Sequence, residues 1–433
     1  IIGGGLSGLM AGLQAAKSGQ RVLIAEDQPQ WGGWLRACED IIIDGMSGQA
    51  WAEQAVSRLQ EMENVTLLSR TTCFGYGDHN FLTLAERVSD HLAEKPAHLP
   101  RQRLWKVRAR QVILATGAIE RPLVFAGNDL PGVMLASAAQ TYLCQYGVLV
   151  GTRGILMTNN DAAWHNAFAL HRAGCRIKVI VDTRQNPSPA LIKQATDLGI
   201  LTRIGSGIIA AHGRLHVARV EIAPLSEAGD ALTGDPEHFD CDLVMMSGGM
   251  NPVVHLHSQA RGKLKWDERS HCFRPSTTHE AEQSVGSCNG SFDAAIGAKE
   301  AIAAARKAIK ANSGEAAEIT LPEITATKIK WTPMPIWQIP TGQPAGQGGK
   351  AFVDFQNDVT ANDIQLAVRE GYHSVEHVKR YTTTGMATDQ GKTSNINALA
   401  ILARERSSDI PSVGTTTFRM PYTPTSIGMI AGR

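Results

Sequence analysis

The first eight residues constrain the fold more than any other part of the chain. Residues 3–8 read GGGLSG, a G-x-G-x-x-G pattern that directly follows an apolar strand and opens an apolar helix. Gly3 permits a tight turn, Gly5 lets a ligand approach the main chain, and Gly8 lets the helix pack closely on the strand. The free N–H groups at the start of such a helix bind phosphate. The sequence therefore predicts a βαβ unit that holds the diphosphate of a dinucleotide.

An acidic residue ends the second strand of this unit. Residues 21–25 form the strand, and Glu26 follows it, 18 residues after Gly8. A carboxylate at this point accepts hydrogen bonds from the adenosine ribose and repels a 2′-phosphate, which favours NAD or FAD over NADP. Gly33 lies in a further glycine turn, of the kind found where the other end of a dinucleotide passes. The alternatives are a glycine turn that has lost its ligand and a Glu26 that only ends a solvated strand.

Two later segments complete the predicted cofactor lobe. Thr116 and Gly117 end a buried strand, and Gly286 and Ser287 precede an alanine-rich helix over 292–311. Both segments resemble the turns that close around the cofactor in two-lobed flavoprotein reductases. In those reductases an Asp at the position of Ser287 binds the ribityl chain of FAD, so its replacement disfavours FAD. The choice between NAD and FAD stays open at this point.

A second alternation of strands and helices predicts a second Rossmann-like lobe. Its strands fall at 154–157, 176–181 and 201–204, and its helices at 162–173 and 189–198. Apolar strands alternating with helices indicate a parallel sheet with both faces covered.

The second lobe lacks the glycines of the first. Thr158 and Asn160 stand where a nucleotide-binding turn has glycine, and Asp161 would repel a phosphate. We therefore interpret this lobe as structural and without NAD(P)H; the alternative is binding through an unusual geometry. The seven cysteines include no C-x₂-C or C-x₄-C pair, so no hydride relay to a dithiol is expected.

These patterns predict an α/β chain with four regions. Residues 1–118 together with 243–311 form the dinucleotide-binding lobe, and 119–242 form the degenerate second lobe. A linker rich in Pro and Gly covers 312–350, and 351–433 form a small helical module and the start of a further linker. The two lobes resemble the disulfide-reductase-like FAD/NAD(P)-binding fold.

The helical module resembles the [2Fe–2S] module of bacterioferritin-associated ferredoxin. The four positions that carry cysteine in that module hold other residues here: Asp354, Gln356, Asp389 and Ser394. Because thiolates hold such clusters, the sequence predicts a cluster fold that has lost its metal.

A possible anion site remains at the start of a helix in this module. Lys392 and Thr393 would offer an ammonium group, a hydroxyl and free main-chain N–H groups. The alternative is a simple Ser394 N-cap beside an exposed Lys392. His255 and His257, with His271, are expected to be satisfied loop histidines, and no metal site is predicted.

Several long strings in the C-terminal part resemble the alpha subunits of heterotetrameric sarcosine oxidase. They cover residues 352–360, 368–377, 380–386, 389–395 and 414–419. The resemblance implies that NAD binds at the first glycine motif. The residues that match its contacts are Ser7, Glu26, Asp27, Gln28, Trp34 and Cys73, of which Gln28 and Trp34 depart from the family pattern.

The same resemblance implies the rest of an oxidase complex. FAD and sarcosine would lie in the beta subunit, and FMN at the alpha–beta interface would pass electrons to oxygen. A folate domain after Arg433 would bind tetrahydrofolate and capture the product as methylenetetrahydrofolate, and gamma and delta subunits would complete the assembly. The alternatives are a component of an opine or amino-acid oxidase, which should keep the cluster cysteines, and a scaffold without catalytic groups. No nucleophile–base pair is evident, so no catalytic residue is predicted within this stretch.

Composition agrees with this prediction. A hydrophobic content of 43% and a formal net charge of +1 give no electrostatic footprint for nucleic acid or membrane, so neither partner is expected. Scattered single cysteines favour reduced thiols in a cytoplasmic protein. The chain opens inside a strand without Met or a secretory signal, from which we expect further sequence before Ile1.

Overall fold

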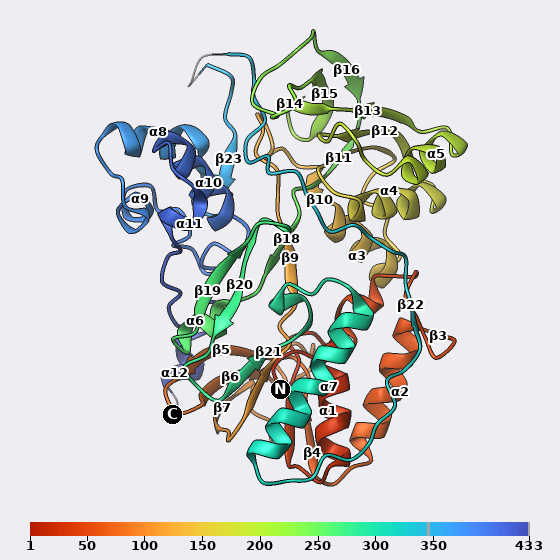
Figure 1. The fold of residues 1–433 in the computed structure, drawn as a ribbon, viewed down its shortest axis with the longest axis vertical. Coiled ribbons are helices and arrows are strands. Elements are labelled where there is room, and N and C mark those ends of the chain that lie inside the picture. Colours follow the sequence, from red (N-terminus) through yellow and green to blue (C-terminus); the bar gives the residue numbers. More distant parts are fainter. Residues whose placement is uncertain (344–346, 432–433) are drawn as a thin grey trace.

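The computed structural model describes residues 1–343 and 347–431. Figure 1 shows two α/β lobes one above the other, with a group of short helices beside them. The chain passes between the lobes in two strands, β9 (Ala118–Glu120) and β18 (Met250–Pro252), which pair with each other in antiparallel orientation. No helix in the described ranges is both long and apolar enough to span a bilayer.

The first lobe is built on a parallel sheet. β1 (Val22–Ala25) pairs with β4 (Val65–Leu68), and β8 (Val112–Leu114) pairs with β21 (Glu282–Ser284), both in parallel. Ile2 forms parallel bridges to both pairs and so joins them into one sheet. The predicted βαβ opening is confirmed.

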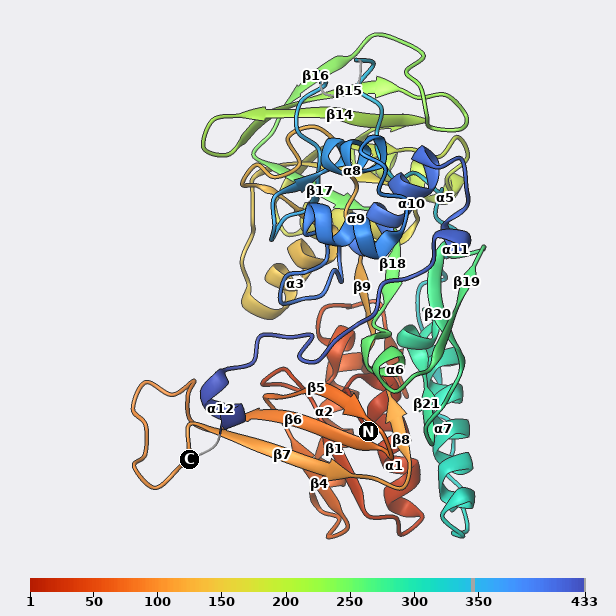
Figure 2. The same cartoon turned by 90° about the vertical axis from the view of Figure 1, so that its left-hand side faces the viewer.

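Helices cover one face of this sheet, and an antiparallel sheet lies on the other side (Figure 2). The helices are α1 (Leu6–Lys17), α2 (Gly48–Gln60) and α7 (Ala294–Ala311). The antiparallel sheet comprises β5 (Thr71–Gly77), β6 (Phe81–Arg87) and β7 (Gln102–Arg108). Small residues bring α1 close to the sheet, because a Cβ on Gly12 would lie 2.5 Å from the Ile24 side chain.

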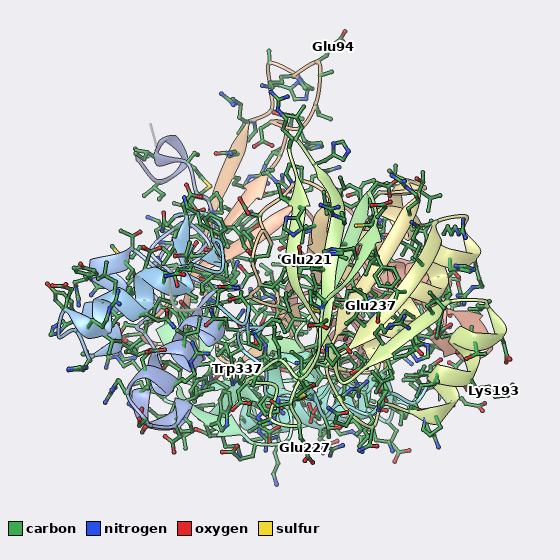
Figure 3. All side chains as sticks on the ribbon, turned by 90° about the horizontal axis from the view of Figure 1, so that it is seen from above. Glu94, Lys193, Glu221, Glu227, Glu237 and Trp337 are labelled. Atoms are coloured by element: carbon green, nitrogen blue, oxygen red, sulfur yellow. The ribbon has the colours of Figure 1, made fainter. Side chains whose placement is uncertain are left out.

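The second lobe is a five-stranded parallel sheet in the order β10-β17-β11-β12-β13. Its strands are β10 (Val133–Leu135), β11 (Arg153–Thr158), β12 (Arg176–Asp182), β13 (Leu201–Ile204) and β17 (Leu243–Ser247). The helices that pack with it are α3 (Ala136–Tyr146), α4 (Ala162–Arg172) and α5 (Pro189–Asp197). A meander packs on its opposite face, formed by β14 (Ser206–Gly213), β15 (Val217–Pro224) and β16 (Glu237–Asp240). Glu221 and Glu237 mark this meander in Figure 3.

The strand 243–247 corrects the predicted domain boundary. We placed it in the first lobe, but β17 pairs with β10 and β11 at the centre of the second sheet. The chain therefore returns to the first lobe only through β18. It then forms α6 (His255–Gln259), β19 (Lys263–Asp267) and β20 (Cys272–Thr277) before β21 and η2 (Gly286–Asn289).

The predicted linker runs along both lobes. Its first part forms β22 (Ile324–Thr325), which pairs with β2 (Ile42–Ile43); β3 (Met46–Ser47) completes that sheet. Further along, Ile336 and Ile339 are buried in the core of the second lobe. Trp337, labelled in Figure 3, stacks on the guanidinium of Arg121 with 4.6 Å between Cζ and the ring centroid.

The C-terminal module has its own apolar core. Its elements are β23 (Phe352–Asp354), β24 (Val359–Thr360), α8 (Ala361–Arg369), α9 (Val375–Thr382), α10 (Asn395–Glu405) and α11 (Ile410–Val413). Thr360 and Asp363 form a capping box at the start of α8. After α11 the chain runs back to the first lobe, where α12 (Ile427–Ala431) lies beside β7 (Figure 2).

Candidate dinucleotide site

Three glycines of the opening turn have different surroundings. A Cβ on Gly3, whose φ is +105°, would lie 2.2 Å from the carbonyl oxygen of Ala115, and a Cβ on Gly8 would lie 1.9 Å from that of Gly3. These two glycines are required by packing. Gly5 differs, because a Cβ there would meet no protein atom closer than 3.9 Å. Gly5 is therefore not required by protein packing, since a Cβ would only touch Gly32 and Gly33, and a diphosphate cradle gives this glycine a separate reason.

Glu26 lies at the end of β1 against the same turn. Its Oε2 accepts the N–H of Gly4 at 2.7 Å, and its Oε1 accepts that of Gln28 at 2.9 Å. The side chain is buried, and burial, with the nearby Asp27 charge, raises the pKa of Glu26 to about 7. Two bonds leave lone pairs free on both oxygens, so the carboxylate can still accept ribose hydroxyls.

The second glycine turn lies directly on the first. Gly32 donates its N–H to the Gly4 carbonyl at 2.9 Å, and a Cβ on Gly33 would lie 3.1 Å from Cα of Gly5. Gly33 has a φ of +53°, which favours glycine. Sequence reasoning missed Trp31, whose ring lies 2.3 Å from the position of a Cβ on Gly4 and covers that glycine.

The turn after β8 and the segment before α7 close the site. Thr116 donates its hydroxyl to the Val253 carbonyl at 2.8 Å, and a Cβ on Gly117 would meet no atom within 4 Å. A Cβ on Gly286 would lie 2.3 Å from Oγ of Ser7, so these two segments touch. Ser287 follows Gly286 in η2.

Glu300, which sequence reasoning also missed, fixes this segment from α7. Its carboxylate accepts the N–H of Gly286 at 3.0 Å and the amide of Asn289 at 3.3 Å. No local pattern marks Glu300, since it stands among ordinary helix-forming residues.

The residues assigned by family resemblance lie on different elements and differ in their exposure to solvent. Asp27 and Gln28 lie just after β1, where the Gln28 amide donates to the Asp27 carboxylate at 2.9 Å. Ser7 faces α7, donating its hydroxyl to the Gly297 carbonyl at 3.3 Å. Trp34 is exposed in η1 (Gly33–Arg36), whereas Cys73 is buried in β5, where burial raises the pKa of its thiol to about 12.

The residues of the first lobe fit a dinucleotide. The open face of Gly5 and the start of α1 would hold its diphosphate, and Glu26 would accept its ribose hydroxyls. The adenosine diphosphate part of NAD would anchor the molecule here, and the chemistry that NAD supplies to oxidoreductases in general is hydride transfer.

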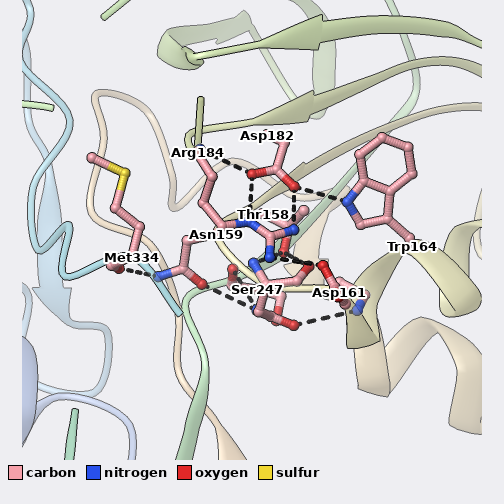
Figure 4. A network of polar contacts seen from close by, with 10 residues as sticks. Thr158, Asn159, Asp161, Trp164, Asp182, Arg184, Ser247 and Met334 are labelled. Carbon is pink, nitrogen blue, oxygen red and sulfur yellow. Dashed lines mark hydrogen bonds and ion pairs between the residues drawn. The ribbon is translucent and has the colours of Figure 1, made fainter. Parts of the chain in front are cut away.

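The corresponding turn of the second lobe is filled by its own side chains (Figure 4). The Asn160 amide donates to the Ser247 hydroxyl at 2.9 Å, and the Asn159 amide donates to the Met334 carbonyl at 2.7 Å. Both asparagines are buried. The linker therefore lies over this turn, and side chains occupy the place where a phosphate would meet bare main chain.

A buried ion network completes that turn. Arg184 lies 2.7 Å from the Asp161 carboxylate and 2.7 Å from that of Asp182, which also accepts the Trp164 indole N–H at 2.9 Å. Burial opposes the charge of Arg184, but the bonds to Asp182 and Asp161 hold its pKa above the usual value. Asp161, predicted to repel phosphate, is thus paired within the protein.

Hydrogen bonds join two of the residues at the predicted cysteine-equivalent positions of the C-terminal module. Asp354, at the first cysteine position, accepts the N–H of Gly385 at 2.7 Å and that of Gln356 at 3.0 Å. The Ser394 hydroxyl, at the last cysteine position, lies 3.4 Å from the same carboxylate. In the described residues no group of three or more His, Cys, Asp or Glu side chains is placed to hold a metal ion.

Lys392 and Thr393 lie just before α10 and are half-buried. The Lys392 ammonium lies 4.6 Å from the ring centroid of Tyr422, and burial lowers its pKa. Lys392 is thus not the exposed side chain of the alternative interpretation. Ser394 precedes α10 without a side-chain capping bond.

The fold and the glycine turn define the class of protein: a two-lobed FAD/NAD(P)-binding oxidoreductase fold with a small C-terminal helical domain. A family model for NAD(P)-binding Rossmann-like domains matches residues 1–54. Among solved structures, an L-proline dehydrogenase from P. horikoshii has a TM-score of 0.71 at 17% identity, covering 100% of this chain and 78% of that chain. A thioredoxin reductase from T. acidophilum has a TM-score of 0.54 at 15% identity, covering 72% of this chain and 97% of its own. These likenesses confirm the predicted fold class.

Sequence similarity identifies the particular relatives, and the chain belongs to the family of sarcosine oxidase alpha subunits. The sarcosine oxidase A3 domain model matches residues 348–433. The sarcosine oxidase alpha subunit of Corynebacterium sp. (strain P-1) is 38% identical over 447 residues, and that of Rhizobium meliloti (strain 1021) is 37% identical over 439; both alignments cover 100% of this chain. The chain spans 45% and 42% of the lengths of these two relatives. The predicted kinship with these subunits is confirmed.

A more distant relationship links the chain to opine oxidases. One opine oxidase component, from Agrobacterium tumefaciens (strain Ach5), is 23% identical over 473 residues, covering 100% of this chain and 90% of its own length.

Proposed function

We propose that this chain is the central part of the alpha subunit of a multi-subunit sarcosine oxidase. The complex would oxidatively demethylate sarcosine to glycine, with formation of peroxide and methylenetetrahydrofolate. The observation that carries the proposal is the 37–38% identity to sarcosine oxidase alpha subunits across the entire chain. The sarcosine would be oxidised at FAD in the beta subunit, and gamma and delta subunits would complete a cytoplasmic heterotetramer.

Within this chain, the first lobe would bind NAD. The open face of Gly5 and the buried Glu26 carboxylate support a dinucleotide with two ribose hydroxyls, and Ser287 in place of a ribityl-binding Asp favours NAD over FAD. The proposed contacts are Gly3, Gly5, Ser7, Gly8, Glu26, Asp27, Gln28, Gly33, Trp34, Cys73, Thr116, Gly117, Gly286 and Ser287. Because side chains fill the corresponding turn of the second lobe, we expect no second dinucleotide in that lobe.

FMN would lie where the C-terminal module meets the beta subunit. Lys392 and Thr393 precede α10, an 11-residue helix, and offer an ammonium group and a hydroxyl at its positive end. A flavin phosphate carries the complementary charge. Tetrahydrofolate would bind in a further domain that is not part of these 433 residues.

Two alternatives lead to different outcomes. A role in an opine oxidase is favoured by the 23% identity to the Agrobacterium component over most of both chains, but the four missing cysteines of the cluster fold speak against it. A scaffold without cofactors would leave the open Gly5 turn without a role.

The test is mass spectrometry of nucleotides released from the purified complex, combined with a peroxide assay on sarcosine and octopine. The proposal predicts NAD, FMN and FAD in equal amounts, and peroxide from sarcosine alone. Peroxide from octopine would instead support the opine oxidase, and release of no NAD would refute the role of the first lobe.

A further inference from the structure

A small cavity lies outside the dinucleotide site, where α6, α10 and the segment after α11 meet. It encloses about 40 Å³, enough for a small ion or a few water molecules. The polar side chains that line it include those of Asn251, His255, Lys392 and Thr416. We call this space the α6–α10 cavity.

His255 is enclosed on the wall of this cavity. Its side chain stacks on Tyr422, with ring centroids 5.1 Å apart and planes 13° apart, and its centroid lies 4.2 Å from that of Phe418. Only 4% of His255 is exposed, yet within the described chain neither ring nitrogen has a hydrogen-bond partner. Buried polar groups normally find partners, because leaving one unpaired is costly. An imidazole in this position therefore calls for a polar ligand.

Two other polar side chains on the cavity wall also lack a hydrogen-bond partner for one of their atoms. The Asn251 carbonyl oxygen accepts from Arg121 at 3.3 Å, which orients the amide, and its Nδ2 has no partner among the described residues. The Thr416 hydroxyl is also buried and unpartnered there. An amide N–H, a hydroxyl and an imidazole thus line one small space.

The charged side chain on the wall of the cavity is that of Lys392, and among the lining residues of the described chain none is Asp or Glu. The carboxylates of Asp389 and Asp27 lie behind this wall and act on the Lys392 charge from outside the lining. Arg121, which holds Asn251, is buried and donates to the carbonyls of Gly248 and His271; no carboxylate pairs with it in the described ranges. Such a field, combined with N–H and O–H donors, favours an anion.

The remaining wall is apolar. Its side chains include Val254, Leu264, Phe273, Ile396 and Leu399. A ligand with a hydrocarbon end can pack against this apolar wall, so such a ligand is favoured over a strongly hydrated ion such as phosphate.

We propose that the α6–α10 cavity binds a small aliphatic carboxylate. Its carboxylate would meet Asn251, His255 and Thr416 near the Lys392 ammonium, and its short hydrocarbon end would meet the apolar wall. An amino-acid zwitterion such as glycine binds less well, because its ammonium group would face a positive site with no lining carboxylate. The site shares Lys392 with the proposed FMN site, whereas Asn251, His255 and Thr416 are not among the proposed NAD and FMN contacts.

The test is calorimetric titration of the intact purified complex with sodium acetate, with sodium chloride and glycine as comparison ligands. Asn251→Asp keeps the oxygen that accepts from Arg121 and replaces only the unpartnered nitrogen by a second carboxylate oxygen. It is expected to weaken acetate binding at least about tenfold, through repulsion of like charges.

A matched pair of valine variants separates the site from general effects on folding. Thr416→Val removes the hydroxyl that lines the cavity while keeping the side-chain shape. Thr423→Val removes another buried hydroxyl without a described partner, which is not among the lining residues. The first variant should weaken acetate binding about three- to tenfold and the second should leave it unchanged. The valine pair alone decides the matter if Asn251→Asp does not assemble.

The outcomes are distinct from those for the proposed function. Loss of acetate binding in Asn251→Asp with unchanged NAD and FMN content supports a carboxylate site that includes Asn251 and that can be removed without loss of either nucleotide. Absence of acetate binding to the wild-type complex would overturn the proposal. Glycine binding as tightly as acetate, or equal acetate binding by the two valine variants, would overturn it as well.

Discussion

Gly5→Ala should separate nucleotide binding from folding. Gly5 has φ −75° and ψ −173°, which alanine adopts without strain, and its Cβ would lie 3.9 Å from the nearest protein atom. We therefore expect the free energy of unfolding of the nucleotide-free protein to stay equal or to rise by about 0.4–1 kcal/mol, because alanine restricts the unfolded chain.

The same methyl group should strongly weaken NAD binding. Gly5 is the second glycine of the G-x-G-x-x-G turn, where a dinucleotide diphosphate lies directly against the main chain, so a methyl group on this residue would take up space that the diphosphate needs. Displacing the diphosphate would cost one or two charge-assisted hydrogen bonds, or about 2–4 kcal/mol, equivalent to roughly 30- to 1,000-fold in Kd. Gly5→Val should abolish NAD retention through purification altogether.

The assay is NAD released per complex after denaturation, measured by mass spectrometry, together with calorimetric Kd and thermal unfolding. Gly77→Ala is the matched control, since this glycine lies in β5 with a Cβ position 3.8 Å from the nearest atom and away from the turn. NAD retained by Gly5→Ala at the wild-type stoichiometry and Kd would refute the diphosphate cradle.

Three further predictions concern charge. Because the pKa of Glu26 is raised to about 7 and ribose hydroxyls stabilise its ionised form, NAD affinity should fall about tenfold between pH 8 and pH 6; a pH-independent Kd in calorimetry would contradict this. Arg184→Met leaves the Asp161 and Asp182 carboxylates buried and unpaired, so chemical denaturation should show a loss of about 3–5 kcal/mol. A loss below about 1 kcal/mol would show that the network is not needed. Lys392→Glu should lower the FMN content of the purified complex, measured by flavin release, and an unchanged content would remove Lys392 from the FMN site.

Much of the fold follows from local sequence patterns. The glycine turn, the apolar strand before it and Glu26 specify one βαβ unit, and the Thr360–Asp363 capping box specifies the start of α8. These features are predictable because each depends on neighbouring residues. Motif positions also predicted that Asp354 and Ser394 stand at two cysteine-equivalent positions, and in the structure Asp354 accepts the N–H of Gly385 while the Ser394 hydroxyl lies 3.4 Å from its carboxylate.

The rest depends on contacts between distant segments. The strand 243–247 is an apolar run that fits the centre of either lobe, and nothing local states that it inserts between β10 and β11. Trp31 covers Gly4 only because the second glycine turn folds back on the first. The α6–α10 cavity escaped prediction for the same reason, since His255 and Thr416 are brought together from parts of the chain far apart in sequence.

A density map of the purified multi-subunit protein would test the central claim most directly. We predict an NAD molecule whose diphosphate lies over the main chain of Gly5 and whose adenosine ribose contacts Glu26, with protein side chains filling the turn at Thr158–Asp161. A map in which the first crevice contains only protein or water, or in which a nucleotide occupies the second lobe, would contradict this prediction.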